Sequence, residues 1–275
     1  MINNPQTVSI TPARGLLATL WRTPTAAKVP NVLAIFWVIK LLTTAGGEAG
    51  SDYLKTLGTA TGGAIEVAMF LSALFLQMRS SRYSALRYWY LAFAIATIGT
   101  GASDVLHLNL NLSYGTVSAL WLAILLVILL IWWRREGTLS IHSITTRSRE
   151  LFYWLTVFAT FALGTAVGDF TAATWRLGYP RSTFLFALII LLPAAAWRLG
   201  ANSVATFWLS YIITRPLGAS IADWIGKPHA ISGANAGDLP TALGGLIMVV
   251  IGTAYLAVTR PDVQPAEEPR RSTKN

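Results

Sequence analysis

Four aspartates recur at one position of a repeated sequence pattern. Counting from a tryptophan, a glycine follows ten residues later and the aspartate fifteen residues later, in every copy. A charged side chain in a membrane segment costs about 2.5–3.5 kcal/mol even on a lenient scale, and it usually marks function. The aspartates can therefore bind a cation, or they can form structural ion pairs. The four sets are Trp37/Gly47/Asp52, Trp89/Gly99/Asp104, Trp154/Gly164/Asp169 and Trp208/Gly218/Asp223.

The segment expected as the first membrane helix, residues 31–53, carries a polar stripe. Lys40, Thr44, Glu48 and Asp52 follow one another at intervals of four, which places them along one helix face. We expect Glu48 to join the four aspartates in a substrate or cation site. The four aspartates are the candidate ligands if the cation is a divalent metal.

Two positive charges also lie within expected membrane segments, at Lys40 and Arg215. If the four repeats close into a ring, the first and fourth become neighbours. Arg215 can then reach Glu48, with Lys40 one turn below Arg215. We expect these residues to act in charge pairing or gating; binding of an anionic substrate by Arg215 is the alternative. Glu66 is interpreted either as a hydrogen-bonded residue between helices or as part of a transport path.

The structural interpretation of the aspartates requires partners for them. An aspartate in the last turn of a helix faces the negative end of the helix dipole, so it is not a cap. Carboxylates exceed intramembrane cations by four, and protons, metal ions or loop side chains must balance them. A basic or potentially basic residue follows each aspartate and offers a local pair: Lys55, His107, Arg176 and Lys227.

Small residues predict which helices pack in the middle. In each copy the glycine is followed four residues later by another small residue, and this spacing lets membrane helices approach closely. We expect the four helices that carry the motif to form an inner group. We expect the tryptophans to pack there or to form a belt at the cytoplasmic interface. The pairs are Gly47/Ser51, Gly99/Ser103, Gly164/Gly168 and Gly218/Ala222.

The composition indicates a polytopic membrane protein. Hydrophobic residues make up 54% of the 275 and charged residues only 12%, against about 25% in soluble domains. Apolar runs are near twenty residues long, enough to cross a bilayer. The second helix of each repeat is apolar all round, which suits a lipid-facing outer layer. The expected fold is all-α, with eight transmembrane helices at 31–53, 58–78, 86–107, 114–133, 150–171, 182–198, 204–224 and 239–259.

Basic residues predict the orientation. The termini and the loops between repeats hold 15 Lys and Arg, whereas the loops within repeats hold four. Both termini are therefore expected in the cytoplasm, with the four repeats parallel and the aspartates at the outer third of the membrane. The expected parts are an N-terminal segment 1–30, repeats 31–80, 84–135, 150–199 and 204–260, and a disordered tail 261–275.

Three segments carry a resemblance to a known family. They are the FW pair at 36–37, YWLTVFATFALGTAVGD at 153–169 and FWLSYIITRPLGASIAD at 207–223. The chain resembles bacterial inner-membrane proteins built from four tandem copies of a two-helix repeat of unknown function with a characteristic tryptophan. The second repeat diverges most, with Ile95 where the others have threonine. The resemblance covers roughly residues 28–260 and implies this architecture and location, but no activity.

The function expected from these residues is transport of a small cation, such as a divalent metal, across the lipid bilayer. The alternative is a non-transporting sensor, assembly factor or small-molecule binder whose aspartates only make structural pairs. No phosphate-binding loop, nucleophile elbow or zinc-protease motif occurs, so we expect neither an enzyme nor a cofactor other than a bound cation. The net charge of +9 indicates orientation rather than a nucleic-acid partner.

Overall fold

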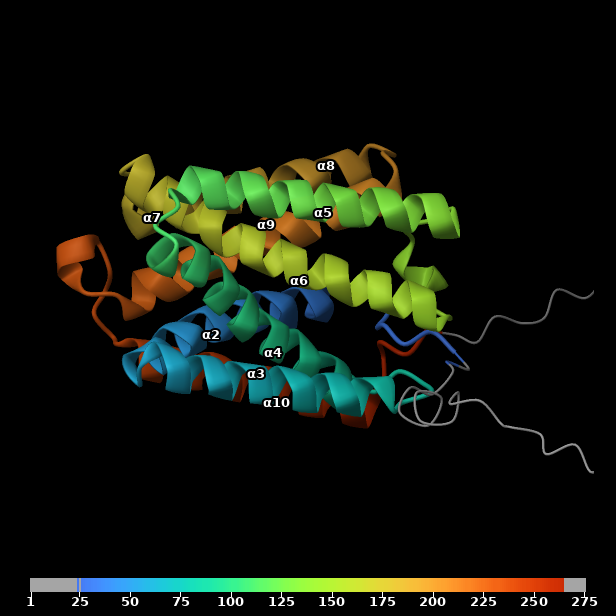
Figure 1. The fold of residues 1–275 in the computed structure, drawn as a ribbon. Helices are drawn as coiled ribbons and strands as arrows, with labels where there is room; N and C mark the ends of the chain where they lie inside the picture. Colours follow the sequence, from blue (N-terminus) through green and yellow to red (C-terminus); the bar gives the residue numbers. More distant parts are fainter. Residues whose placement is uncertain (1–23, 25, 265–275) are drawn as a thin grey trace, which may run out of the picture.

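The computed structural model describes residue 24 and residues 26–264, and this part of the chain is all-α without a strand. Residues 1–23, 25 and 265–275 lie outside the described residues, and with them most of the expected N-terminal segment and tail. The helices run roughly along one direction (Figure 1). They are α2 (Ala34–Thr56), α3 (Thr59–Met78), α4 (Ala85–Asp104), α5 (Tyr114–Glu136), α6 (Arg147–Asp169), α7 (Gly178–Ile189), α8 (Leu191–Arg198), α9 (Ser203–Gly226) and α10 (Asp238–Thr259).

All eight segments expected as helices are helical, and the sixth is broken. It begins at Gly178 and consists of α7 and α8, separated at Ile190. Pro193 explains the break, because proline has no N–H to donate to the carbonyl four residues earlier and its ring clashes there. That carbonyl belongs to Ile189, the last residue of α7. Wide π-helical turns extend α4 and α6 directly beyond their aspartates, at Val105–Asn109 and Phe170–Thr174.

Six helices of the described chain are long and apolar enough to cross a membrane, which makes the protein a membrane protein. They are α3, α4 with its π turn, α5, α6 with its π turn, α7 joined to α8, and α10. The two remaining helices, α2 and α9, have 23 and 24 residues but carry Lys40, Glu48, Arg215 and Asp223. In the most apolar stretches of α4 and α6, 67% and 72% of the residues are buried. In α3, α5, α7 joined to α8, and α10, the second helices of the four repeats, the buried share is only 17–22%. The predicted division into inner and outer helices is therefore correct.

The inner helices form a closed ring. α2 contacts α4, α4 contacts α6, α6 contacts α9, and α9 returns to α2. Each outer helix packs most closely on the inner helix of the following repeat: α3 on α4, α5 on α6, α7 on α9, and α10 on α2. In Figure 1, α5 lies outside this group on one side, and α3 and α10 lie outside it on the other. The four repeats thus form a cycle in which the fourth repeat packs against the first.

The motif glycines lie at the seams of the ring. A Cβ atom added at Gly47 would lie 2.3 Å from the Cβ of Ala96 on α4. At Gly99, Gly164 and Gly218 the nearest atom of the next inner helix would lie 2.9, 2.2 and 2.5 Å away. All four distances are too short for a real side chain, so the glycines are what permits the close approach. The residues that they meet each stand seven positions after a motif tryptophan: Ala96, Phe161, Arg215 and Thr44.

The tryptophan end of the bundle is packed with aromatic rings. Trp89, Trp154 and Trp208 are at most 5% exposed, so they pack between helices instead of forming a belt towards lipid. Both ends of the described chain reach this end of the bundle (Figure 1), where the Asn31 N–H donates to the Asp262 carbonyl at 2.7 Å. Asp262 is buried and accepts a hydrogen bond from Tyr83, and Gln264 donates to the Val29 carbonyl at 3.2 Å. These two residues of the tail expected to be disordered therefore contact the bundle, whereas Pro261 and Val263 are exposed.

Candidate cation site

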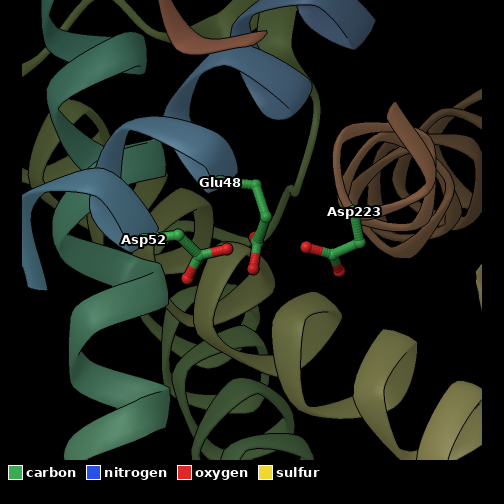
Figure 2. A group of neighbouring side chains, drawn as sticks. All are labelled: Glu48, Asp52 and Asp223. Atoms are coloured by element: carbon green, nitrogen blue, oxygen red, sulfur yellow. The ribbon is translucent and has the colours of Figure 1, made fainter. Parts of the chain in front are cut away.

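Three carboxylates converge between α2 and α9. Figure 2 shows Glu48 between Asp52 and Asp223, with the three carboxyl groups turned towards one another. One oxygen of each lies within 4.8 Å of the others. Glu48 and Asp52 lie one turn apart on the same face of α2, and closure of the ring places Asp223 opposite them. Glu48 is 3% and Asp223 5% exposed, so the group is almost fully screened from solvent.

The structure brings together two of the four aspartates predicted as metal ligands. Asp52 and Asp223 belong to the converging group, but the third member is Glu48 in place of Asp104 and Asp169. Asp104 is instead bonded to Lys55. Asp169 lies within electrostatic range of the other carboxylates without joining the group. Two of the four aspartates therefore lie outside the triad, Asp104 paired with Lys55 and Asp169 without a side-chain partner in the described chain.

Two lysines at helix C-termini, Lys55 in the last turn of α2 and Lys227 directly after α9, form ion pairs between repeats. Lys55 Nζ lies 2.5 Å from Asp52 and also contacts Asp104 of the next repeat. Lys227 Nζ lies 2.6 Å from Asp52 and 3.2 Å from Asp238. Burial alone would lower the pKa of Lys227, but the nearby carboxylates, chiefly Asp52, raise it above its ordinary range. The predicted local pairing therefore holds for Lys55, whereas Lys227 pairs with the aspartate of the first repeat.

The other two expected partners do not pair with their aspartates. His107 bonds through Nδ1 to the carbonyl of Leu112 at 2.7 Å, and Arg176 is exposed. Among the residues that the structure describes, the side-chain carboxylates of Asp169 and Asp223 form no hydrogen bond and no ion pair. Glu48 and the four aspartates of the repeat motif together supply five carboxylates. Three cations face them: Lys55, Lys227 and Arg215. Part of the predicted carboxylate excess persists and requires a bound cation or protons.

Glu66 occupies a hydrogen-bonded position between helices. Ser51 on α2 donates to its Oε1 at 2.6 Å. Its Oε2 fills the space beside Gly101 on α4, where an added Cβ would lie only 2.2 Å away. This geometry matches the first of the two interpretations that the sequence offered for Glu66.

Arg215 and Glu48 form the ion pair that ring closure predicts. Their Nη2 and Oε2 atoms are 2.7 Å apart, and both side chains are buried. Thr100 and Thr165 each donate to the same carboxylate oxygen at 3.0 Å. These threonines stand at the repeat position of Glu48, eleven residues after their tryptophans. The seam between the first and fourth repeats is therefore closed by a charge-assisted network.

Lys40 lies below this network, one helical turn towards the tryptophan end. Its Nζ is fully buried and has no hydrogen-bond partner within residues 26–264. It lies 4.0 Å from the ring centre of Tyr211 and 4.3 Å from that of Phe161. The aromatic faces therefore provide the only stabilisation that the described residues give this cation.

One buried charge cluster has no signal in the sequence. Lys28 Nζ lies 2.6 Å from Glu150 and donates to the Gln77 carbonyl at 3.0 Å, with both charged side chains fully buried. Burial lowers the pKa of Lys28, and Glu150 offsets this only in part. A glutamate in the first turn of a helix is explained by the helix dipole, and a lysine before a helix by membrane orientation. Neither residue stands out before the fold is known.

These features define a class: an all-α membrane protein whose four two-helix repeats close into a ring around buried charges. Comparison with family models then identifies the family. The model described as a Repeat of Unknown Function (DUF347) matches residues 35–83, 87–138, 152–200 and 206–261. The chain belongs to this family, and the matches coincide with the four predicted repeats. Searches of curated proteins and of solved structures found no match.

Proposed function

We propose that the protein is a membrane transporter for a small cation, with divalent metals as the class to test first. The observation that carries this proposal is the convergence of Glu48, Asp52 and Asp223. Carboxylate oxygens are the ligands that magnesium, calcium and manganese ions prefer. The side-chain carboxylate of Asp223 is buried without a hydrogen bond or ion pair in the described chain, so a bound cation would supply its missing partner.

The position of the triad supports transport over simple binding. The acidic group lies between the first and last helices of a ring whose repeats are related about one axis. Transporters with parallel repeats use such an axis along the membrane normal and bind their substrates where the repeats meet. Arg215 and the aromatic tryptophan end close the ring beneath the triad. Transport would therefore require these helices to separate on that side.

A second function remains a candidate because most charges find partners inside the protein. Lys55, Lys227 and Arg215 all pair with carboxylates, which also suits a non-transporting sensor, assembly factor or small-molecule binder. Cation uptake into vesicles that contain the purified protein separates the two functions. Uptake above that of empty vesicles supports transport, and cation binding without uptake supports the alternative.

The proposed topology has eight spans in a bacterial inner membrane, with both termini in the cytoplasm and the carboxylates towards the outer side. The 15-to-four distribution of basic residues supports it, and so do the two ends of the described chain, which lie at the same end of the bundle. Because the chain has no cysteine, single cysteines report sidedness directly. On intact cells, an impermeant thiol reagent should label Ala234→Cys and spare Ala201→Cys, two exposed loop positions. Labelling of Ala201→Cys would contradict this orientation.

Divalent cations should raise the melting temperature of the purified protein, and Asp223→Asn should abolish that rise while the protein stays folded. A ligand present at 100 times its Kd stabilises by about 2.7 kcal/mol, which thermal unfolding resolves readily. Asp238→Asn is the matched control, because Asp238 is a carboxylate that shares Lys227 with Asp52 of the triad but itself lies outside the triad. If no cation in a panel raises the melting temperature, or if Asp223→Asn keeps the rise, the proposed site is wrong.

A further inference from the structure

The guanidinium of Arg215 sits where all three other repeats can reach it. Its Nε donates to the Phe161 carbonyl at 3.1 Å, its Nη1 to the Thr44 carbonyl at 3.0 Å, and its Nη2 to the Ala96 carbonyl at 3.3 Å. These three residues and Arg215 occupy one repeat position, seven residues after the tryptophan. A carbonyl oxygen has two lone pairs and can accept a second hydrogen bond beside the one within its helix.

A second layer of oxygens completes the surroundings of Arg215. Its Nη2 lies 2.7 Å from the carboxylate of Glu48 and 2.9 Å from the hydroxyl of Thr165, and it also bonds the hydroxyl of Thr100. These three residues share the repeat position eleven after the tryptophan. The first three repeats therefore contribute equivalent oxygens at two levels. The fourth repeat contributes the arginine itself and, at the second position, Ala219, which has no side-chain oxygen.

The oxygens surround a fully buried positive charge. Arg215 is 0% exposed, so its guanidinium has exchanged water for carbonyl, hydroxyl and carboxylate oxygens. These are the groups with which proteins replace the hydration shell of a cation, as in the carbonyl rings of ion channels. The guanidinium thus occupies a position in the ring where oxygens surround it as they would surround a bound free cation.

We propose that the ring axis contains a cation site, distinct from the carboxylate triad, which is filled by the chain's own Arg215. The site takes a cation of the guanidinium type when this side chain is absent. Glu48 belongs to both sites, so Arg215 competes with a cation in the triad for this carboxylate. The effect of this competition on transport rests on the proposed function, whereas the axial site itself does not.

Chemical rescue tests the axial site. In Arg215→Ala, millimolar methylguanidinium should produce a saturable rise in melting temperature, because it returns the group that the substitution removed. Wild-type protein should show no such rise, since its site is filled. Urea, which is planar but uncharged, and sodium chloride at equal ionic strength should have no effect on the variant. An equal rise in wild type or with urea would overturn the proposal, and so would the absence of a rise.

Arg215→Ala leaves Glu48 buried without its cation and can fail to fold. Glu48→Gln/Arg215→Ala removes this unpaired charge and keeps the other oxygens. In this variant methylguanidinium should still raise the melting temperature, with a higher half-maximal concentration. If neither variant yields folded protein, extraction in methylguanidinium should restore it, and failure to do so refutes the site. Metal-dependent melting of the wild type tests the triad separately, so failure of one proposal is distinguishable from failure of the other.

Discussion

Arg215→Ala and Glu48→Ala are each expected to reduce the free energy of unfolding by about 3–5 kcal/mol, and the double substitution by clearly less than their sum. Each single change leaves one buried charge without its partner at the seam between the first and fourth repeats. The double change removes both charges, so its cost is limited to the lost packing and to the other hydrogen bonds of Arg215. The expected coupling is therefore large and favourable to the pair.

Reversible unfolding in mixed micelles, applied to the four proteins of this cycle, measures the coupling energy. The ion pair of Arg149 and Glu136 provides the control cycle, because its 2.9 Å contact lies between side chains that are 25% and 17% exposed. A partly exposed pair contributes about 0–1 kcal/mol. Strictly additive losses in the Arg215/Glu48 cycle, or coupling no larger than in the control, would contradict a structural role for the buried pair.

Periodicity made much of this architecture predictable. The tryptophan, glycine and aspartate recur in register, so the sequence alone indicates four repeats, an inner group of helices and close seams at the glycines. Parallel repeats permit ring closure, and on that condition the sequence predicted the contact between Arg215 and Glu48, which are 167 positions apart. Polar contacts that depend on repeat position can be predicted from a sequence, because residues at the same repeat position occupy equivalent positions in the fold.

Contacts outside the repeat pattern were not predictable. Lys227 follows Asp223 in sequence, but its flexible side chain reaches Asp52, which leaves Asp223 free for the triad. Which carboxylates belong to the triad therefore depends on which aspartates Lys55 and Lys227 contact. Main-chain carbonyls around Arg215 escape prediction for another reason: every residue has one, and only the packed ring reveals which of them face the axis.

Gly47→Ala is expected to destabilise the protein strongly, whereas Gly50→Ala on the same helix should not. The added Cβ at Gly47 would lie 2.3 Å from the Cβ of Ala96 and 3.1 Å from two backbone atoms of α4. Relief requires the two helices to move apart, and overpacking of this kind costs about 1–3 kcal/mol, occasionally more. At Gly50 an added Cβ meets no atom within 4 Å, and alanine favours the helix over glycine by up to about 1 kcal/mol.

The same unfolding measurement compares the two alanine variants, and a third variant tests the cause. Ala96→Gly removes the side-chain atom that the new Cβ would meet, so combining it with Gly47→Ala should recover part of the loss. Recovery must be specific to this pair: Ala96→Gly combined with Gly50→Ala should bring no benefit, because position 50 faces open space. Equal stability of Gly47→Ala and Gly50→Ala would mean that the α2–α4 seam is looser than the structure has it, and close packing at the other three glycines would then be in doubt as well.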